Sequence, residues 1–277
     1  MRPFEYFRPS SLKEASELLV RYGDGGHLLN GGTDLIVRMR DGLTLPSAVI
    51  DLKGIEQLSR IREDEESVYI GATVNLNQVG RHETIGKSFP YLAEAALSVG
   101  SKQVRNRATC IGNLCNASPL ADTATPLMAL DAVLEVFGPE GEREIPIRDF
   151  FVFVRKTSLK PGEIVKGVRV TKTAGQGVFT KLARRKEVDL SMVCMTLLKA
   201  EDGWRLSYGA VAPTPVRLPK TEALLNQGAA LEEVLSCAVS EVKPIDDVRA
   251  SREYRLEMVK VMLKRGLEQI EKGGAVS

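Results

Sequence analysis

The spacing of apolar residues changes between helical and strand-like several times along the first hundred positions. Between Ser11 and Gly23 the apolar residues recur at helical intervals, which predicts a helix that begins with a capping box at Ser11–Glu14 and ends at Gly23. Short apolar runs between turn residues are typical of buried strands. These patterns predict strands over 27–29, 47–51 and 67–72 and further helices over 35–40, 75–81 and 90–97.

The second half of the chain shows an antiparallel pattern. A helix is expected over 122–130, and the strand 132–137 should pair with 143–147 through a turn at Gly138–Gly141. Further strands are predicted over 164–170, 178–183, 192–199 and 204–211, and helices over 221–225, 231–242 and 251–271.

The last of these helices has an apolar face and a basic face. We expect its inward face to hold Tyr254, Met258, Val261, Met262 and Leu267. Its basic residues are expected to form a solvated face, and docking to a partner subunit is the alternative.

Two polar connectors, Asp51–Gly54 and Thr171–Gly177, divide these elements. We therefore predict an α+β protein with parts at 1–55, 56–172 and 177–277. The first part is a small α/β unit, and the last is an antiparallel sheet accompanied by helices.

The composition is that of an ordinary globular protein. Of 277 residues 43% are hydrophobic and 27% are charged, and 38 basic residues against 36 acidic ones give a net charge of +2. So small a charge creates no strong attraction to nucleic acid or to an anionic membrane. No apolar run approaches the ~20 residues of a membrane span. The N-terminus lacks the apolar segment of a secretion signal, so we expect a cytoplasmic protein.

Cysteine and histidine are too few or too scattered for most metal sites. Cys110 and Cys115 lie close together in sequence, but Cys194 and Cys237 lie far away, which disfavours both a disulfide framework and an iron–sulfur site. The 2 histidines disfavour a multi-histidine metal site and a Ser-His-Asp triad. We expect the cysteines to be small buried residues.

Two glycine-bearing segments carry the strongest functional pattern. They are Leu28–Asp34, with the sequence Leu-Leu-Asn-Gly-Gly-Thr-Asp, and Ala108–Leu114, with the sequence Ala-Thr-Cys-Ile-Gly-Asn-Leu. Glycine lets the backbone approach a ligand closely, and successive N–H groups in such turns can hold a diphosphate. The polar stretch Asn116–Asp122 follows the second segment and strengthens the pattern.

Two common nucleotide-binding motifs do not match these glycines. Gly26 and Gly31 have the glycine spacing of a P-loop, but Gly32 stands where that motif requires lysine. A G-x-G-x-x-G pattern that starts at Gly23 fails because Leu28 occupies the place of its third glycine. The sequence therefore favours neither a P-loop NTPase nor a Rossmann-type cofactor domain.

At these segments the chain resembles the FAD-binding (medium) subunit of the xanthine dehydrogenase / carbon monoxide dehydrogenase family of molybdenum hydroxylases. The resemblance covers nearly the whole chain, and its last segment is typical of the family's C-terminal domain. The segments that carry it are Phe4–Ala15, Asn30–Asp34, Gln103–Thr109, Asp122–Pro126 and Asp247–Arg255.

This resemblance implies a two-part FAD-binding domain of the PCMH / vanillyl-alcohol-oxidase-like type, followed by an α+β C-terminal domain like that of the CO dehydrogenase flavoprotein. It also implies an oxidoreductase subunit within a hetero-oligomer. In such a complex a molybdopterin-binding large subunit hydroxylates the substrate, and a [2Fe–2S] small subunit passes electrons to FAD. NAD⁺ or another acceptor then receives them.

The resemblance also assigns flavin-binding roles to residues of this chain. The first segment would wrap the diphosphate and the neighbouring ribityl chain through Leu28, Leu29, Asn30, Gly31, Gly32, Thr33, Asp34 and Leu35. The residues that would line the slot or bind the other side of the diphosphate are Val99, Ala108, Thr109, Gly112 and Asn113. The residues placed near the ribityl chain and the ring system are Cys115, Asn116, Asp122, Ile164 and Lys181.

Several alternatives stay open. From the residues alone, Asp122 is also a possible helix N-cap and Lys181 a possible exposed strand lysine. Ile111 stands where the family has a glycine, and a β-branched residue is strained wherever φ is positive. A flavin-free scaffold subunit is therefore one alternative function, and a self-contained FAD-dependent oxidoreductase is another.

Overall fold

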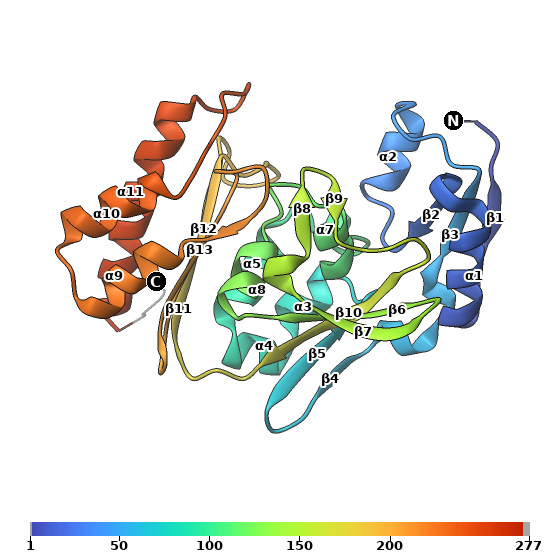
Figure 1. Ribbon diagram of the computed structural model, residues 1–277, viewed down its shortest axis with the longest axis horizontal. Coiled ribbons are helices and arrows are strands. Elements are labelled where there is room, and N and C mark those ends of the chain that lie inside the picture. The colour runs from blue at the N-terminus through green and yellow to red at the C-terminus, as the bar shows by residue number, and fades with distance from the viewer. Residues whose placement is uncertain (1, 274–277) are drawn as a thin grey trace.

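The computed structural model describes residues 2–273, which form three consecutive parts that each contain a sheet (Figure 1). Helices accompany a mainly parallel sheet in the first part and antiparallel sheets in the other two, which confirms the predicted α+β class. Among residues 2–273, no helix combines the length and the apolar character that crossing a bilayer requires.

The first part is a three-stranded parallel sheet. Its strand order is β1 (Glu5–Phe7), β3 (Ala48–Asp51) and β2 (Gly26–Leu29), with α1 (Leu12–Tyr22) before β2 and α2 (Leu35–Arg40) after it. The predicted cap at Ser11 is present, since its Oγ accepts from the N–H of Glu14 at 3.2 Å. The capping box differs from the prediction because the Glu14 carboxylate accepts from the N–H of Ser10, at 3.0 Å, instead of that of Ser11.

The second part is a five-stranded antiparallel sheet with helices. Its strand order is β4 (Ile61–Glu63), β5 (Ser67–Gly71), β10 (Ile164–Thr171), β6 (Val133–Gly138) and β7 (Gly141–Pro146). Its helices are α3 (Leu76–Arg81), α4 (Glu83–Ser88), α5 (Pro90–Ser98), α6 (Lys102–Arg105), α7 (Cys110–Cys115) and α8 (Ala124–Ala129). A separate hairpin consists of β8 (Phe151–Phe153) and β9 (Lys156–Thr157).

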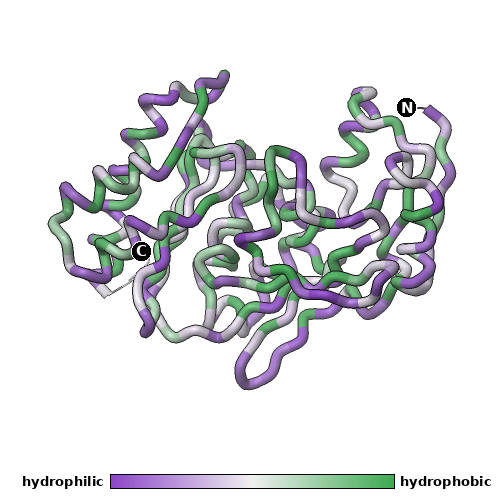
Figure 2. The backbone as a smooth tube through the Cα atoms, viewed as in Figure 1, coloured by the Kyte–Doolittle hydropathy of each residue, from purple (hydrophilic) through white to green (hydrophobic). Residues whose placement is uncertain are grey.

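The first two parts share one hydrophobic core. Leu12 and Ile50 of the first part belong to the same buried cluster as Leu134 and Val168 of the second. The buried Ser16 hydroxyl, which donates to the carbonyl oxygen of Gly162 at 2.8 Å, also joins them. Figure 2 shows this inside-to-outside pattern, with hydrophobic colours in the central strands and hydrophilic colours in turns such as the one between β4 and β5. The boundary at residue 55 stays a prediction.

The third part has a core of its own. The strands of its antiparallel sheet lie in the order in which they follow along the chain: β11 (Gly175–Leu182), β12 (Val193–Ala200), β13 (Gly203–Gly209) and β14 (Val216–Arg217). Figure 1 shows α9 (Pro219–Gln227), α10 (Leu231–Ser240) and α11 (Arg252–Glu271) beside this sheet. Strand β11 begins inside the connector expected over Thr171–Gly177.

Helix α11 has the predicted length, but one residue of its predicted inward face is wrong. Tyr254 is 41% exposed, and its neighbour Arg255 is buried instead, at 2%. Met262 is buried as predicted, and the other three expected residues are partly buried. The reason is that the guanidinium of Arg255 donates to the carbonyl oxygens of Met192 and Ala210, at 2.5 and 2.9 Å. These bonds compensate for its burial, so the cation takes the core-facing position.

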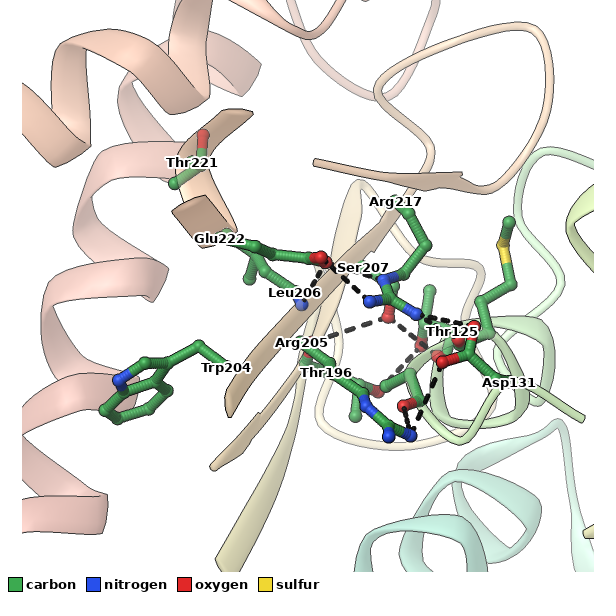
Figure 3. Close-up of polar contacts among 12 residues, drawn as sticks. Thr125, Asp131, Thr196, Trp204, Arg205, Leu206, Ser207, Arg217, Thr221 and Glu222 are labelled. Carbon is green, nitrogen blue, oxygen red and sulfur yellow. Dashed lines mark hydrogen bonds and ion pairs between the residues drawn. The ribbon is translucent and has the colours of Figure 1, made fainter. Parts of the chain in front are cut away.

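A polar network joins the second and third parts (Figure 3). Arg217 donates to both carboxylate oxygens of Glu222, at 2.6 and 2.8 Å, and to Asp131 just beyond α8, at 2.9 Å. The buried Ser207 hydroxyl donates to the carbonyl oxygen of Thr125 in α8 at 2.7 Å. Since α8 begins two residues after Asp122, this network fixes Asp122 relative to the C-terminal sheet.

Candidate functional site

The two glycine-bearing segments meet in space. Strand β2 ends at Leu29 and α2 begins at Leu35, so the residues between them form a turn above the parallel sheet. A Cβ atom at Gly31 would lie 2.1 Å from the carbonyl oxygen of Arg107 and 2.9 Å from the Cα of Ala108. Only glycine permits this approach, so Gly31 is required for the contact between the segments.

The first segment leaves its backbone donors unused. Among residues 2–273, no acceptor receives a hydrogen bond from the N–H groups of Gly31, Gly32 or Thr33. Gly32 has a φ of +77°, in the left-handed region. Consecutive unpaired N–H groups with a left-handed residue among them form an anion-binding nest.

The second segment is a helix N-terminus and not the loop that we expected. Helix α7 begins at Cys110, and the Thr109 hydroxyl caps it by accepting from the N–H of Gly112 at 2.9 Å. Ile111 lies inside α7, is 1% exposed and has no positive φ. The strain expected at Ile111 is therefore absent. The helical arrangement also leaves N–H groups of the first turn without intrahelical partners, which favours an anion there.

Asn30 and Asn113 connect the two segments to neighbouring residues through side-chain hydrogen bonds. The Nδ2 of Asn30 donates to the carbonyl oxygen of Ala72 at 3.1 Å. The Oδ1 of Asn30 is buried and has no partner among the described residues. The Oδ1 of Asn113 accepts from the Thr123 hydroxyl at 2.6 Å. An unpaired buried acceptor is costly, and a donor on a ligand, such as a sugar hydroxyl, would satisfy it.

Lys53 is a site residue that the sequence reasoning missed. Its ammonium donates to the carbonyl oxygen of Asn30 at 2.9 Å and pairs with Asp51 at 2.6 Å. The hydroxyl of Tyr6 donates to the other oxygen of that carboxylate at 2.6 Å. This cluster supports the first segment from the side of the sheet. The sequence showed Asp51 and Lys53 only as part of a connector, so no local pattern marked them.

Asp34 and Asn116 meet at the open edge of the two segments. The Nδ2 of Asn116 donates to Oδ1 of Asp34 at 2.8 Å, although the two residues are 82 positions apart. Arg155 contacts both residues as well, and nothing in its sequence surroundings marked it as a site residue.

A buried ion pair lies where the second part meets strand β11. The ammonium of Lys181 is 2.7 Å from the carboxylate of Asp122 and donates to the carbonyl oxygen of Ser98, next to Val99, at 3.0 Å. The hydroxyl of Ser191 donates to the other oxygen of Asp122. Burial raises the pKa of the Asp122 carboxyl, and the charge of Lys181 opposes that rise. Lys181 is thus a buried partner of Asp122 and not an exposed strand lysine, and Asp122 makes no cap to a helix N-terminus with its side chain.

The remaining predicted residues are placed as follows. Four of them are half-buried within or beside the segments, namely Leu28, Leu29, Leu35 and Val99. Ala108 is buried under Gly31. Cys115 is exposed at the end of α7, against the expectation of a buried side chain. Ile164 is completely buried in the core shared by the first two parts and does not reach the surface of the site, so its ring contact stays a prediction.

The cysteines form no redox or metal centre within the described residues. All four are free thiols, and residues 2–273 contain no group of three or more cysteine, histidine and acidic side chains that could hold a metal ion. Burial raises the pKa of the Cys110 thiol to about 12, so this group stays protonated and unreactive.

Together these features fit a long dinucleotide cofactor. Unused N–H groups of the first segment and the N-terminus of α7 suit a diphosphate, and the unpaired Asn30 oxygen suits a hydroxyl. The Lys181–Asp122 pair adds a cation from strand β11 and an acceptor from the stretch just before α8. A cation near the pyrimidine end of a flavin stabilises its reduced form.

Comparisons with known proteins agree with this geometry. Residues 2–172 match the family model "FAD binding domain in molybdopterin dehydrogenase", and residues 178–270 match "CO dehydrogenase flavoprotein C-terminal domain". The chain is 31% identical to the nicotinate dehydrogenase FAD-subunit of Eubacterium barkeri, with 99% of both chains covered. It is 29% identical to the carbon monoxide dehydrogenase medium chain of Afipia carboxidovorans, with 96% of both covered.

Solved structures show the same likeness. A chain of the carbon monoxide dehydrogenase from Hydrogenophaga pseudoflava superimposes with a TM-score of 0.92 at 31% identity, covering 97% of this chain and 98% of that one. The fold and the matched models lead to one conclusion. This chain belongs to the family of FAD-binding medium subunits of molybdenum hydroxylases, the oxidoreductases related to xanthine dehydrogenase and carbon monoxide dehydrogenase.

Proposed function

We propose that this chain is the electron-transfer subunit of a molybdenum hydroxylase complex. It receives electrons from the [2Fe–2S] clusters of a small subunit and delivers them through FAD to NAD⁺ or another acceptor, while a molybdopterin-binding large subunit hydroxylates the substrate. The relatives' names, a "medium chain" and a "FAD-subunit", support the place within a complex. The four free thiols are in keeping with the reducing cytoplasm.

The contact between Gly31 and the Arg107–Ala108 backbone is the observation that carries this proposal. It brings two sets of N–H donors from different parts of the chain to one edge, where they would hold a diphosphate. FAD, when bound, supplies the redox chemistry. The residues of this chain would bind and orient it: the first segment and α7 would hold the diphosphate, and Asp122 and Lys181 would lie at the ribityl and ring end.

Such a subunit requires no acid–base dyad of its own. Lys181 and Asp122 already neutralise each other at 2.7 Å, so they provide polarity near the ring without acting as acid and base. The pair also keeps the ring end dry, since both side chains are buried, at 13% and 7% exposed. We assign no substrate-hydroxylating residue to this chain.

The first experiment measures the flavin. The chain is purified alone and after co-production with its partner subunits, and any released flavin is identified by chromatography. FAD at about one molecule per chain supports the proposal. A Gly32→Val variant should lose FAD, because a β-branched residue at a φ of +77° forces the first segment out of shape. Unchanged FAD content in that variant would overturn the assignment of the first segment.

A second experiment examines the acceptor. The complex is reduced with dithionite in the absence of oxygen, and NAD⁺ is then added while the flavin absorbance is followed. Reoxidation of the flavin by NAD⁺ selects this acceptor. If a quinone or an artificial dye reoxidises the flavin and NAD⁺ does not, the acceptor is of another class.

Two alternative functions remain distinguishable by these experiments. A self-contained FAD-dependent oxidoreductase would reduce its flavin with a small substrate when purified without partners. A flavin-free scaffold would stay colourless inside the assembled complex. The one argument for a flavin-free scaffold was strain at Ile111, but Ile111 is helical and buried in α7.

A further inference from the structure

Arg155 occupies a left-handed position at the tip of the β8–β9 hairpin. Phe153 pairs with Lys156, so Val154 and Arg155 form the turn between the two strands. Arg155 has a φ of +61°. A positive φ at the second central residue is ordinary in a tight turn, but the contacts of Arg155 reach well beyond the hairpin.

The backbone of Arg155 is bound to a second left-handed residue. Its N–H donates to the carbonyl oxygen of Ala117 at 2.9 Å. Ala117 follows the end of α7 and has a φ of +44°. Two left-handed residues thus meet where α7 ends, and the hairpin is fastened to that helix through its main chain.

The guanidinium of Arg155 then connects the two cofactor segments. Its Nη1 donates to the side-chain oxygen of Asn116 and, at 3.3 Å, to the carbonyl oxygen of the same residue. The same nitrogen lies 3.9 Å from Oδ1 of Asp34. Since Asn116 itself donates to that Asp34 oxygen at 2.8 Å, the three side chains form a closed set. We call Asp34, Asn116 and Arg155 the clasp.

The clasp lies at the ends of the two segments that would hold the diphosphate. Asp34 immediately precedes α2 and directly follows the unused N–H groups of the first segment. Asn116 is the C-cap of α7. Gly31 fixes the contact of the segments on one side, against Arg107. The clasp fixes it on the other, 82 residues apart in the chain.

We infer that Arg155 is a positioning residue for FAD, acting through Asn116 and Asp34 to hold the two diphosphate-binding segments at a fixed separation. The inference rests on the proposed function only for the identity of the ligand. Arg155 itself need not touch the cofactor. A single nitrogen, Nη1, makes the contacts with both neighbours, so a lysine ammonium that reaches the same point would preserve part of the clasp.

The test uses the full-length chain and three variants. Arg155→Asn removes the guanidinium and keeps a residue that tolerates the left-handed conformation. Arg155→Lys keeps a single cationic donor on a side chain of different shape. Lys156→Asn is the matched control, because it changes the charge by the same amount at the next, exposed position of the hairpin. FAD affinity is measured by equilibrium binding to flavin-free protein, and hydrogen exchange is measured for peptides that cover 28–36 and 108–117.

For Arg155→Asn we expect an FAD dissociation constant at least about tenfold higher than that of the wild type, the effect of losing a charge-assisted hydrogen bond. Exchange should quicken in both peptides in the absence of flavin. Arg155→Lys should lie between Arg155→Asn and the wild type, because one cationic donor makes all the side-chain contacts of Arg155, and Lys156→Asn should resemble the wild type.

Other outcomes would overturn the inference. If Arg155→Asn weakens FAD binding but leaves the exchange of both peptides unchanged, the charge acts directly on the cofactor and positioning is not its role. If Arg155→Asn leaves both the affinity and the exchange of the two peptides unchanged, the clasp does not hold the segments. If exchange quickens in Arg155→Asn as expected but the wild type never binds FAD, the proposed function is contradicted and the clasp stays supported.

Discussion

Gly31 packs so closely on Arg107 that a side chain between them has no room. A Cβ atom at Gly31 would lie 2.1 Å from the carbonyl oxygen of Arg107 and 2.7 Å from its carbonyl carbon. These are backbone atoms, which cannot turn aside as the end of a side chain can. The contact joins residues from different parts of the molecule, and the cofactor site that we propose is built on it.

Replacing Gly31 with alanine should therefore separate the two segments. We expect Gly31→Ala to lower the free energy of unfolding by about 1–3 kcal/mol, as overpacking does, and to remove bound FAD. Thermal unfolding and flavin content measure the two effects. Gly86→Ala is the control, because Gly86 lies in α4 and a Cβ there meets nothing within 4 Å. It should retain FAD and gain about 0.5–1 kcal/mol from better helix propensity. A Gly31→Ala protein with full FAD content would contradict the close contact.

The buried pair Lys181–Asp122 should be more costly to break than to remove. Lys181→Met leaves the Asp122 carboxylate buried without its cation, so we expect a loss of about 3–5 kcal/mol at neutral pH. The double variant Lys181→Met, Asp122→Asn removes both charges and should recover part of that loss. Denaturant unfolding of the flavin-free protein gives the values. The single variant Asp122→Asn completes the cycle, and a double-variant loss equal to the sum of the two single losses would show that the side chains do not interact.

The Arg143–Glu163 pair should make stability depend on acid pH. Hydrogen bonds from the Arg143 guanidinium, at 2.7 and 2.8 Å, hold the pKa of the Glu163 carboxyl below its ordinary value of 4.5. A carboxyl with a lowered pKa in the folded state stabilises the protein above the unfolded pKa, and this contribution is lost as pH falls through the folded pKa.

Glu163→Gln removes that titration. We expect the melting temperature of the wild type to exceed that of Glu163→Gln above pH 4.5, and the difference to shrink as the pH falls below it. Glu65→Gln, which changes an exposed carboxylate, is the control and should run parallel to the wild type. A difference between Glu163→Gln and the wild type that stays constant down to strongly acidic pH would contradict this assignment.

Local pattern was sufficient for most of the elements. The helix between Ser11 and Gly23 and the helix Leu35–Arg40 were predicted with their observed ends. For the first of them the reason is local, because the cap at Ser11 and the stop at Gly23 act within a few residues. Helix α7 was missed because its local pattern is misleading. Gly112 in a six-residue helix has the appearance of a turn, and only the Thr109 hydroxyl, bound to the N–H of Gly112, shows the cap.

The resemblance to known flavoproteins pointed to the two segments, but not to their supports. Lys53 and Arg155 contact the site through the fold, from a connector and from a hairpin tip. Each lies far in sequence from at least one residue that it binds, so neither spacing nor residue type marked them. Which predicted residues touch the flavin stays a prediction, and Ile164, buried in the core, is the one whose position fits its expected role least well.

Helix α11 offers a test of how a buried cation replaces an expected aromatic residue. Arg255 is 2% exposed and binds the carbonyl oxygen of Ala210 at 2.9 Å and the carboxylate of Asp247 at 2.7 Å, whereas Tyr254 is 41% exposed. We therefore expect Arg255→Leu to cost about 3–5 kcal/mol, because it leaves Asp247 without its buried partner and two carbonyl oxygens without donors. Tyr254→Ser, at the position that helical periodicity had placed in the core, should stay within about 0.5 kcal/mol of the wild type. Denaturant unfolding of the two variants measures both effects. A larger loss for Tyr254→Ser than for Arg255→Leu would show that the helix presents the tyrosine to the core after all.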